Sequence, residues 1–317
     1  MVDVKNSDME YRNLGKTGLK VSALGFGASP LGGVFGDIDE AEGVRTVHAA
    51  IDLGINFFDV SPYYGLARAE TVLGKALREI PRDRYYVATK VGRYGADQFD
   101  FSARRVVDCV DESLARLNVD YVDLIQCHDI EFGSLDQVIH ETLPALRRLK
   151  EQGKVRFIGV TGLPLKIFRY VLDRAQVDTV LSYCHYCLND TALDTLIPYL
   201  KEKGVGIINA SPLSMGLLSN QGAPAWHPAS DEIKAACAEA AAFCRKRGAD
   251  ISQVAIQFSL ANRDLATTLV GMARYQNLLK NVRWMQESIH QDLLTEVLKI
   301  LAPIHNQTWP SGLPENN

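Results

Sequence analysis

Short apolar runs alternate with longer segments of helical period along almost the whole of this 317-residue sequence. The runs are rich in β-branched residues and nearly continuous in apolar side chains, which is typical of parallel strands buried on both faces. Eight runs occur, at residues 21–28, 56–60, 85–91, 122–128, 157–162, 179–184, 206–211 and 266–271. Eight alternations of strand and helix predict an α/β fold, the closed (β/α)8 TIM barrel, as one domain over residues 1–317.

The segments between these runs repeat apolar residues three and four positions apart, as amphipathic helices do. Residues 103–117 are the clearest case, because Val106, Val110 and Leu117 share one stripe. Asp39 is a candidate N-cap for the first helix, and Gly153 ends the helix around residues 143–149. Further helices are expected at residues 39–53, 192–203, 251–260 and 277–285.

An open, doubly wound parallel sheet is the alternative fold for alternating strands and helices. That fold favours three spaced glycines after the first strand, where the backbone approaches a pyrophosphate. Residues 25–30 instead place Pro30 where the third glycine belongs. The sequence therefore favours the barrel.

Three segments lie outside the repeat. Residues 11–19, with Gly15 and Gly18, precede the first barrel strand, and we expect a hairpin that closes the bottom of the barrel. Residues 211–230 are long and rich in glycine and proline, a length typical of functional loops. The tail after Leu301 shows no periodicity and is expected to fold over the barrel mouth.

Charge and hydropathy exclude several classes of partner. The formal net charge of −4 gives the chain no basic field that would attract nucleic acid or an anionic membrane. No run approaches the roughly 18 apolar residues of a membrane span. Residues 1–16 are polar, without a stretch of signal-peptide type, so we expect a cytoplasmic protein.

Cysteine usage argues against a disulfide scaffold and against a metal site. Six cysteines in 317 residues are too few for a scaffold. Cys184 and Cys187 form a CxxC without a second pair at zinc spacing, so we interpret them as strand packing and expect no metal. The sequence also lacks a heptad repeat, which favours a monomer.

Isolated polar residues end three of the predicted strands. Asp59 ends the second run, with Tyr64 five residues later, and Lys90 and His128 end the third and fourth runs. Barrel enzymes carry their active sites at the carboxyl ends of the strands. We therefore expect these four side chains to meet at the barrel mouth.

Tyr64 is the candidate acid or base of this set. A phenol has an unperturbed pKa of about 10, and a neighbouring ammonium favours the phenolate. We expect Lys90 to supply that ammonium, Asp59 to hold Lys90, and His128 to orient the substrate. Each residue alone also has a structural explanation, but their joint placement favours a proton-transfer site.

Longer motifs carry a family resemblance. They lie at residues 11–19, 24–27, 59–65, 70–74 and 160–162, with further matches at residues 26–32, 128–136, 181–186, 210–213 and 309–312. On these motifs the chain resembles an aldo-keto reductase over essentially its whole length. The resemblance implies hydride transfer with a nicotinamide cofactor, and the second set of motifs implies a sugar substrate oxidised at its anomeric hydroxyl.

The resemblance also implies site residues. The family's catalytic Asp, Tyr, Lys and His fall on the four residues above. Its cofactor contacts fall on Gly27, Asp59, Thr161, Gly162, Tyr183, Ser211, Leu213, Gly216, Gly271, Asn277 and Asn281. The family's stacking tyrosine falls on Ala210, so another residue must pack on the nicotinamide. Ser29, Arg93 and Asp129 follow strands one, three and four and are candidate substrate contacts.

The cofactor is expected to be NAD rather than NADP. NADP-binding members hold the 2′-phosphate with Lys and Arg after strand eight, because a dianion needs paired cationic donors. Gly271, Met272 and Asn277 replace that set here, and Arg274 is the cation that remains.

Other functions remain open at this stage. An NADP-linked aldehyde or ketone reductase, or a dehydrogenase for L-fucose or D-arabinose, would use the same four residues. A redox-sensing, cofactor-binding subunit is disfavoured by the intact set. A metal-dependent barrel hydrolase would need a His-x-His on the first strand, and none of the seven histidines makes that pattern.

Overall fold

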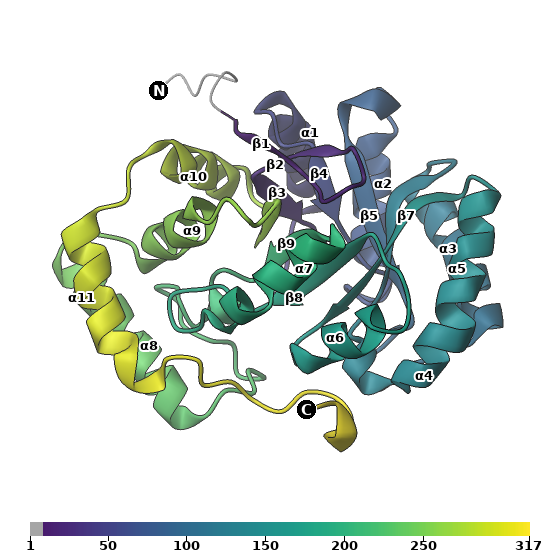
Figure 1. Cartoon of the computed structure of the whole chain (residues 1–317). Helices are drawn as coiled ribbons and strands as arrows, with labels where there is room; N and C mark the ends of the chain where they lie inside the picture. Colours follow the sequence, from purple (N-terminus) through teal and green to yellow (C-terminus); the bar gives the residue numbers. More distant parts are fainter. Residues whose placement is uncertain (1–8) are drawn as a thin grey trace.

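The structure, a computed structural model, describes residues 9–317 and contains a closed barrel of parallel strands. The strands follow one another around the barrel in sequence order, and the last pairs with the first (Figure 1). The expected (β/α)8 fold is thereby confirmed. Residues 1–8, part of the segment in which we expect no signal peptide, lie outside the described residues. Over residues 9–317, none of the helices has the length and apolar character needed to cross a membrane.

The barrel strands coincide with the eight apolar runs. They are β3 (Leu24–Gly27), β4 (Phe57–Asp59), β5 (Tyr86–Val91), β6 (Val122–Cys127), β7 (Val155–Gly162), β8 (Thr179–Tyr183), β9 (Gly206–Ala210) and β10 (Thr267–Gly271). We expected the first run to form one strand. It is instead divided between two strands, because the chain bends at Ala23. Before the bend, Ser22 donates its hydroxyl to the carbonyl of Leu24, and its backbone N–H donates to the side-chain amide oxygen of Asn56.

An N-terminal hairpin closes the bottom of the barrel, as expected. It pairs β1 (Tyr11–Asn13) with β2 (Lys20–Ser22) in antiparallel register. Its loop buries Leu14 and Leu19 against the interior side chains of the barrel. Gly15 has a φ of +54°, and a Cβ there would lie 2.3 Å from the backbone nitrogen of Gly206, so only glycine lets the loop approach so closely.

Helices cover the outside of the barrel (Figure 1). They are α1 (Glu40–Asp52), α2 (Arg68–Leu77), α3 (Ala103–Leu117), α4 (Leu135–Gln137), α5 (Leu143–Glu151), α6 (Lys166–Leu172), α7 (Ile197–Lys203), α8 (Asp231–Lys246), α9 (Ile251–Ala261), α10 (Tyr275–Gln286) and α11 (Gln291–Leu301). Asp39 caps α1 by accepting the N–H of Ala41 at 2.9 Å, as expected.

Helix α8 was not expected from the sequence. It begins directly after the long loop, where Ser230 caps it by accepting the N–H of Ile233. Its buried face consists largely of small side chains, among them Cys237, Ala240 and Cys244. Small side chains such as alanine and cysteine produce only a weak contrast between the apolar and polar faces of a helix. The sequence therefore did not indicate this helix of about four turns.

The C-terminal tail returns to the mouth of the barrel, as expected. It runs from α11 past the end of the barrel opposite the N-terminal hairpin (Figure 1, yellow). Trp309 is buried against His227, at 4.9 Å between ring centroids. Farther on, the N–H of Leu313 donates to the carbonyl of Glu131 at 2.8 Å. Glu131 follows β6, so the tail is fixed beside the strand ends.

Two loops meet at the mouth through a glycine contact that positions Tyr64. A Cβ on Gly65 would lie 2.1 Å from the carbonyl oxygen of Gly32, and Gly65 has a φ of +63°. A Cβ on Gly32 would in turn lie 2.5 Å from the carbonyl oxygen of Tyr64. The backbone of Tyr64 is therefore held by a close approach that a larger residue would break.

Gly65→Ala is expected to lower the free energy of unfolding by at least about 3 kcal/mol, because strain at positive φ adds to a backbone clash. Gly153→Ala is the matched control, since Gly153 also has positive φ (+77°) but has open space around it. That control should cost only about 1–2 kcal/mol. Denaturant titrations measure both values, and equal losses would contradict the proposed contact.

Candidate active site

A buried ion pair lies at the centre of the mouth. Asp59 ends β4 and Lys90 lies near the end of β5, with exposed fractions of 4% and 1%. The Lys90 ammonium pairs with Asp59 Oδ1, donates to the carbonyl of Val60 at 2.9 Å and lies 3.3 Å from the hydroxyl of Tyr64. An ammonium has three protons to donate, so all three have acceptors. One of them is directed at Tyr64.

Gln126 completes this centre and was missed in the sequence. It lies on β6, next to Lys90 in the strand register, and donates its amide to Asp59 Oδ2 at 2.8 Å. Asp59 therefore has a partner on each oxygen. The signal was present in the sequence, because Gln126 is a polar residue inside an apolar strand run.

The pKa of Lys90 rises in this setting. Burial alone lowers it, but the charge of Asp59 and the contact with Tyr64 outweigh burial, so the amine stays an ammonium. Burial raises the pKa of Tyr64 to about 12, and the opposing effect of Lys90 is smaller. Our expectation of a phenol acidified below its ordinary pKa is therefore wrong for the protein alone. Tyr64 holds its proton because a buried phenolate would lose its hydration.

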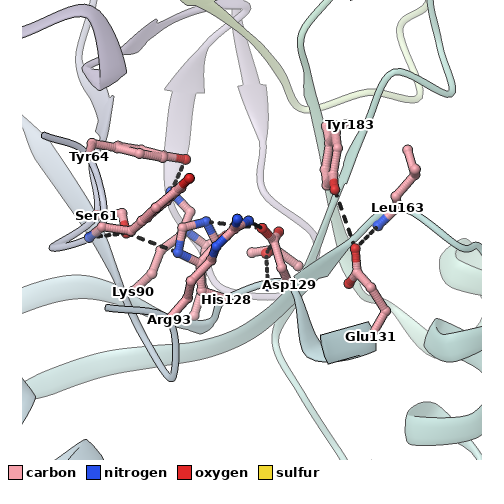
Figure 2. A network of polar contacts seen from close by, with 12 residues as sticks. Ser61, Tyr64, Lys90, Arg93, His128, Asp129, Glu131, Leu163 and Tyr183 are labelled. Atoms are coloured by element: carbon pink, nitrogen blue, oxygen red, sulfur yellow. Dashed lines mark hydrogen bonds and ion pairs between the residues drawn. The ribbon is translucent and has the colours of Figure 1, made fainter. Parts of the chain in front are cut away.

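His128 lies beside Tyr64 at the end of β6 (Figure 2). The two rings meet edge to face, with centroids 5.6 Å apart. Its Nδ1 lies 2.9 Å from the hydroxyl of Ser61, and its Nε2 lies 3.6 Å from a carboxylate oxygen of Asp129. Burial lowers the pKa of His128 to about 3, so the imidazole is neutral at ordinary pH. The structure thus brings Asp59, Tyr64, Lys90 and His128 together.

Arg93 and Asp129 form a second ion pair next to His128 (Figure 2). Arg93 donates to Asp129 Oδ2 at 2.5 Å, and its guanidinium lies 4.0 Å from the ring centre of Tyr63. Asp129 has a positive φ of 49°, a strained conformation for a residue with a side chain. Its N–H is held by the hydroxyl of Thr161 at 2.9 Å. These two candidate substrate contacts are therefore fixed in place beside the imidazole.

Three of the residues expected to contact the cofactor lie against Asp129 or Glu131, and none of them lines the groove at the mouth. The hydroxyl of Thr161 is fully buried and engaged by Asp129. A Cβ on Gly162 would lie 2.6 Å from Oε2 of Glu131, and the hydroxyl of Tyr183 donates to Oε1 of Glu131 at 3.3 Å. Together they form a wall around Glu131.

A groove of about 360 Å³ runs from Asp59 and Tyr64 to the end of β10. Asp59 and Tyr64 lie at its inner end, and Arg274 lies near its outer end. Its lining includes the expected residues Gly27, Ser29, Ser211, Leu213, Gly216, Gly271 and Asn277. Asn281 is buried on α10 and does not line it. A larger hollow of about 710 Å³ lies beside Lys16 and Gly204 at the barrel bottom, away from these groups.

The groove has the features that a dinucleotide requires. Gly27 and Gly271, at the ends of their strands, line the groove without side chains that would fill it. A Cβ on Gly271 would lie 3.0 Å from Pro30. The loop around Ser211 and Gly216 has residues at positive φ, an arrangement in which backbone N–H groups can face an anion. Phe35, which lines the groove, lies 5.9 Å from Trp226 between ring centres, and both rings are about half exposed.

Glu131 joins the mouth to the C-terminal tail, and sequence reasoning gave it no role. Its Oε1 accepts the N–H of Leu163 at 3.1 Å and the hydroxyl of Ser311 at 3.0 Å. Its backbone carbonyl accepts the side-chain amide of Asn316 at 2.9 Å. Burial, and then the charge of Asp129, raise the pKa of Glu131 to about 8.

This pKa predicts that the folded protein loses stability as the pH rises. The folded protein keeps the Glu131 proton up to about pH 8, whereas the unfolded chain releases it near pH 4.5. The folded state therefore binds more protons in this window, and stability falls as the pH rises through it. Glu131→Gln, which keeps an acceptor and does not titrate, should flatten the fall in melting temperature between about pH 5 and pH 8.

Glu239→Gln, at an exposed position on α8, is the matched control and should keep the slope of the parent protein. Melting curves at several pH values measure all three proteins. A Glu131→Gln protein with the parent's slope would show that this carboxyl does not titrate in that window.

Comparisons with known proteins agree with this geometry. Residues 23–302 match the Aldo/keto reductase family. L-galactose dehydrogenase of Arabidopsis thaliana is 56% identical over 97% of this chain and 99% of its own. D-arabinose 1-dehydrogenase of Saccharomyces cerevisiae is 31% identical, over 87% of this chain and 90% of its own.

Solved structures show the same barrel. The holo form of aldo-keto reductase AKR11C1 from Bacillus halodurans superposes with a TM-score of 0.76 at 27% identity, covering 96% of this chain and 98% of that one. Family match, relatives and superposition all span the barrel and its mouth. This chain belongs to the aldo/keto reductase family.

Proposed function

We propose that the protein is an NAD-dependent sugar dehydrogenase that oxidises L-galactose at C1 to L-galactono-1,4-lactone. The observation that carries the proposal is the Tyr64 hydroxyl, 3.3 Å from a buried ammonium at the inner end of the groove. The relative that is 56% identical over nearly the whole chain supports the choice of sugar.

The reaction removes a proton from the anomeric hydroxyl and a hydride from C1. The nicotinamide of NAD, when bound, accepts the hydride. Tyr64 takes the hydroxyl proton, and the Lys90 ammonium stabilises the phenolate that must form first. Oxidising a cyclic hemiacetal in this way gives a lactone directly. Since burial raises the pKa of Tyr64, the phenolate becomes more abundant, and oxidation faster, as the pH rises.

The Arg93–Asp129 pair is the proposed contact for the sugar's other hydroxyls. It combines a donor and an acceptor in one rigid unit, and Asp129 lies 3.6 Å from the His128 imidazole. Hydroxyl groups both donate and accept, so they need partners of both kinds. Ser29, which lines the groove, is a further proposed contact.

A second candidate is oxidation of another aldose by the same steps. The 31% identical relative is a D-arabinose 1-dehydrogenase, which favours D-arabinose over substrates outside the sugars. Initial rates with L-galactose, L-fucose and D-arabinose, each with NAD and NADP, distinguish these possibilities. An NADP-linked aldehyde reductase would instead show its highest rates with NADPH and simple aldehydes.

Tyr64→Phe should lower kcat for sugar oxidation by at least about 100-fold, because it removes the proton acceptor. Binding of NAD, measured by calorimetry, should persist because the ring remains. Tyr199→Phe is the control: its hydroxyl bonds Asp173 on the outer helices and should not affect turnover. Turnover near the parent rate in Tyr64→Phe would rule out the proposed proton acceptor.

NADH is expected to bind more tightly than NADPH, because Arg274 is the groove-lining cation at the outer end and a 2′-phosphate needs paired donors. Arg274→Ala should weaken NADPH binding by roughly tenfold, the size of a charge-assisted hydrogen bond, and change NADH binding little. Lys280→Ala, exposed on the same helix, should alter neither. Fluorescence titrations measure these constants, and tighter NADPH binding by the parent would exclude NAD preference.

A further inference from the structure

We propose that Ser61 is a positioning residue that holds His128 in the Nε2–H tautomer, so that this nitrogen presents a proton to the substrate oxygen. The catalytic part of this inference rests on the proposed function. The tautomer itself follows from the contacts of Ser61 and can be measured without substrate or cofactor.

Ser61 lies in the loop that also carries Tyr64, and it is fully buried. Its hydroxyl oxygen makes two contacts (Figure 2). The backbone N–H of Tyr63 donates to it at 3.1 Å, and Nδ1 of His128 lies 2.9 Å away. The loop geometry therefore places this oxygen between a fixed donor and the imidazole.

The count of protons determines which atom donates. A serine hydroxyl has one proton and two acceptor positions. If Nδ1 carried the histidine proton, both acceptor positions would be filled and the Ser61 proton would have no acceptor, since the Ser61 hydroxyl has no other hydrogen-bond partner among residues 9–317. A buried hydroxyl proton without an acceptor is costly. Ser61 therefore donates to Nδ1, and the histidine proton resides on Nε2.

The opposite side of the ring supports the same tautomer. Nε2 faces Asp129 Oδ2 at 3.6 Å, and a carboxylate favours a proton on the nitrogen that faces it. Asp129 is held there by Arg93 and by the hydroxyl of Thr161. Because the imidazole is neutral, only one of its nitrogens carries a proton, and the two contacts agree on Nε2.

The tautomer matters for the chemistry at Tyr64. A protonated Nε2 donates to the substrate oxygen and leaves the hydroxyl proton to Tyr64. A bare Nε2 would instead accept that proton and compete with the tyrosine. One short loop, residues 61–64, would thus supply both the proton acceptor and the group that keeps the histidine from competing with it.

The test is a long-range ¹H–¹⁵N spectrum of protein labelled with ¹⁵N-histidine, without cofactor or sugar. His128 is assigned from the signals that disappear in His128→Gln. The parent protein should show Nε2–H for this residue. Ser61→Ala should shift it toward a mixture of tautomers, and Ser61→Thr, which keeps the hydroxyl, should restore it.

Ser259→Ala is the matched control. Ser259 is also fully buried and hydrogen-bonded, to the carbonyl of Tyr186 at 3.0 Å, but it lies on α9. The His128 signals should not move in that variant. In parallel, kcat/KM for sugar oxidation should fall about tenfold in Ser61→Ala, the size of one neutral hydrogen bond, with NAD binding unchanged.

A parent protein with the proton on Nδ1 overturns the inference, and so does a folded Ser61→Ala with an unchanged Nε2–H signal. The parent spectrum decides the matter even if the alanine variant fails to fold. Sugar oxidation is assayed separately, so a parent with the expected tautomer but no turnover would remove the proposed function alone.

Discussion

The arrangement of the mouth depends on the buried pair of Asp59 and Lys90. Removing two charges from water is costly, and such pairs contribute little to stability compared with apolar packing. Here every proton of the ammonium and both carboxylate oxygens have partners, from Gln126, Val60 and Tyr64. Because an apolar core would serve the fold equally well, the pair is best explained by the charge that it maintains beside a phenol.

Strand order explains how distant residues come to share this site. β4, β5 and β6 are neighbours in the barrel, and the register pairs Lys90 with Gln126 directly. All three strands end at the same mouth, so the polar residue that ends each apolar run must lie near the others. This is why the meeting of the catalytic candidates could be predicted from the sequence, once eight alternations had indicated a closed barrel.

Other features depended on information that periodicity does not contain. We predicted the wrong direction for the pKa shift of Tyr64. The prediction considered the neighbouring charge of Lys90 but not burial, which has the larger effect here. Thr161 and Gly162, expected at the cofactor, also lie against Asp129 and Glu131, which follow β6, and the sequence did not indicate these contacts. Glu131, which lies against Gly162, also accepts the hydroxyl of Ser311. These two residues are far apart in sequence, and no local pattern indicates a contact between them.

The contact of the C-terminal tail with Glu131 makes the two sides of the mouth chemically different. Lys90 and Arg93 bring cations to one side, beside Tyr64 and His128, whereas Glu131 and Tyr183 form a wall that the tail completes. Asp129 joins the two sides through its bond to Arg93. A polyhydroxylated ring would meet the proton-transfer groups at one edge and fixed polar groups at another, so a single orientation of the sugar is favoured. The barrel strands thus position the proton-transfer groups, and the C-terminal tail, through Glu131, helps to fix the polar groups that would orient the sugar.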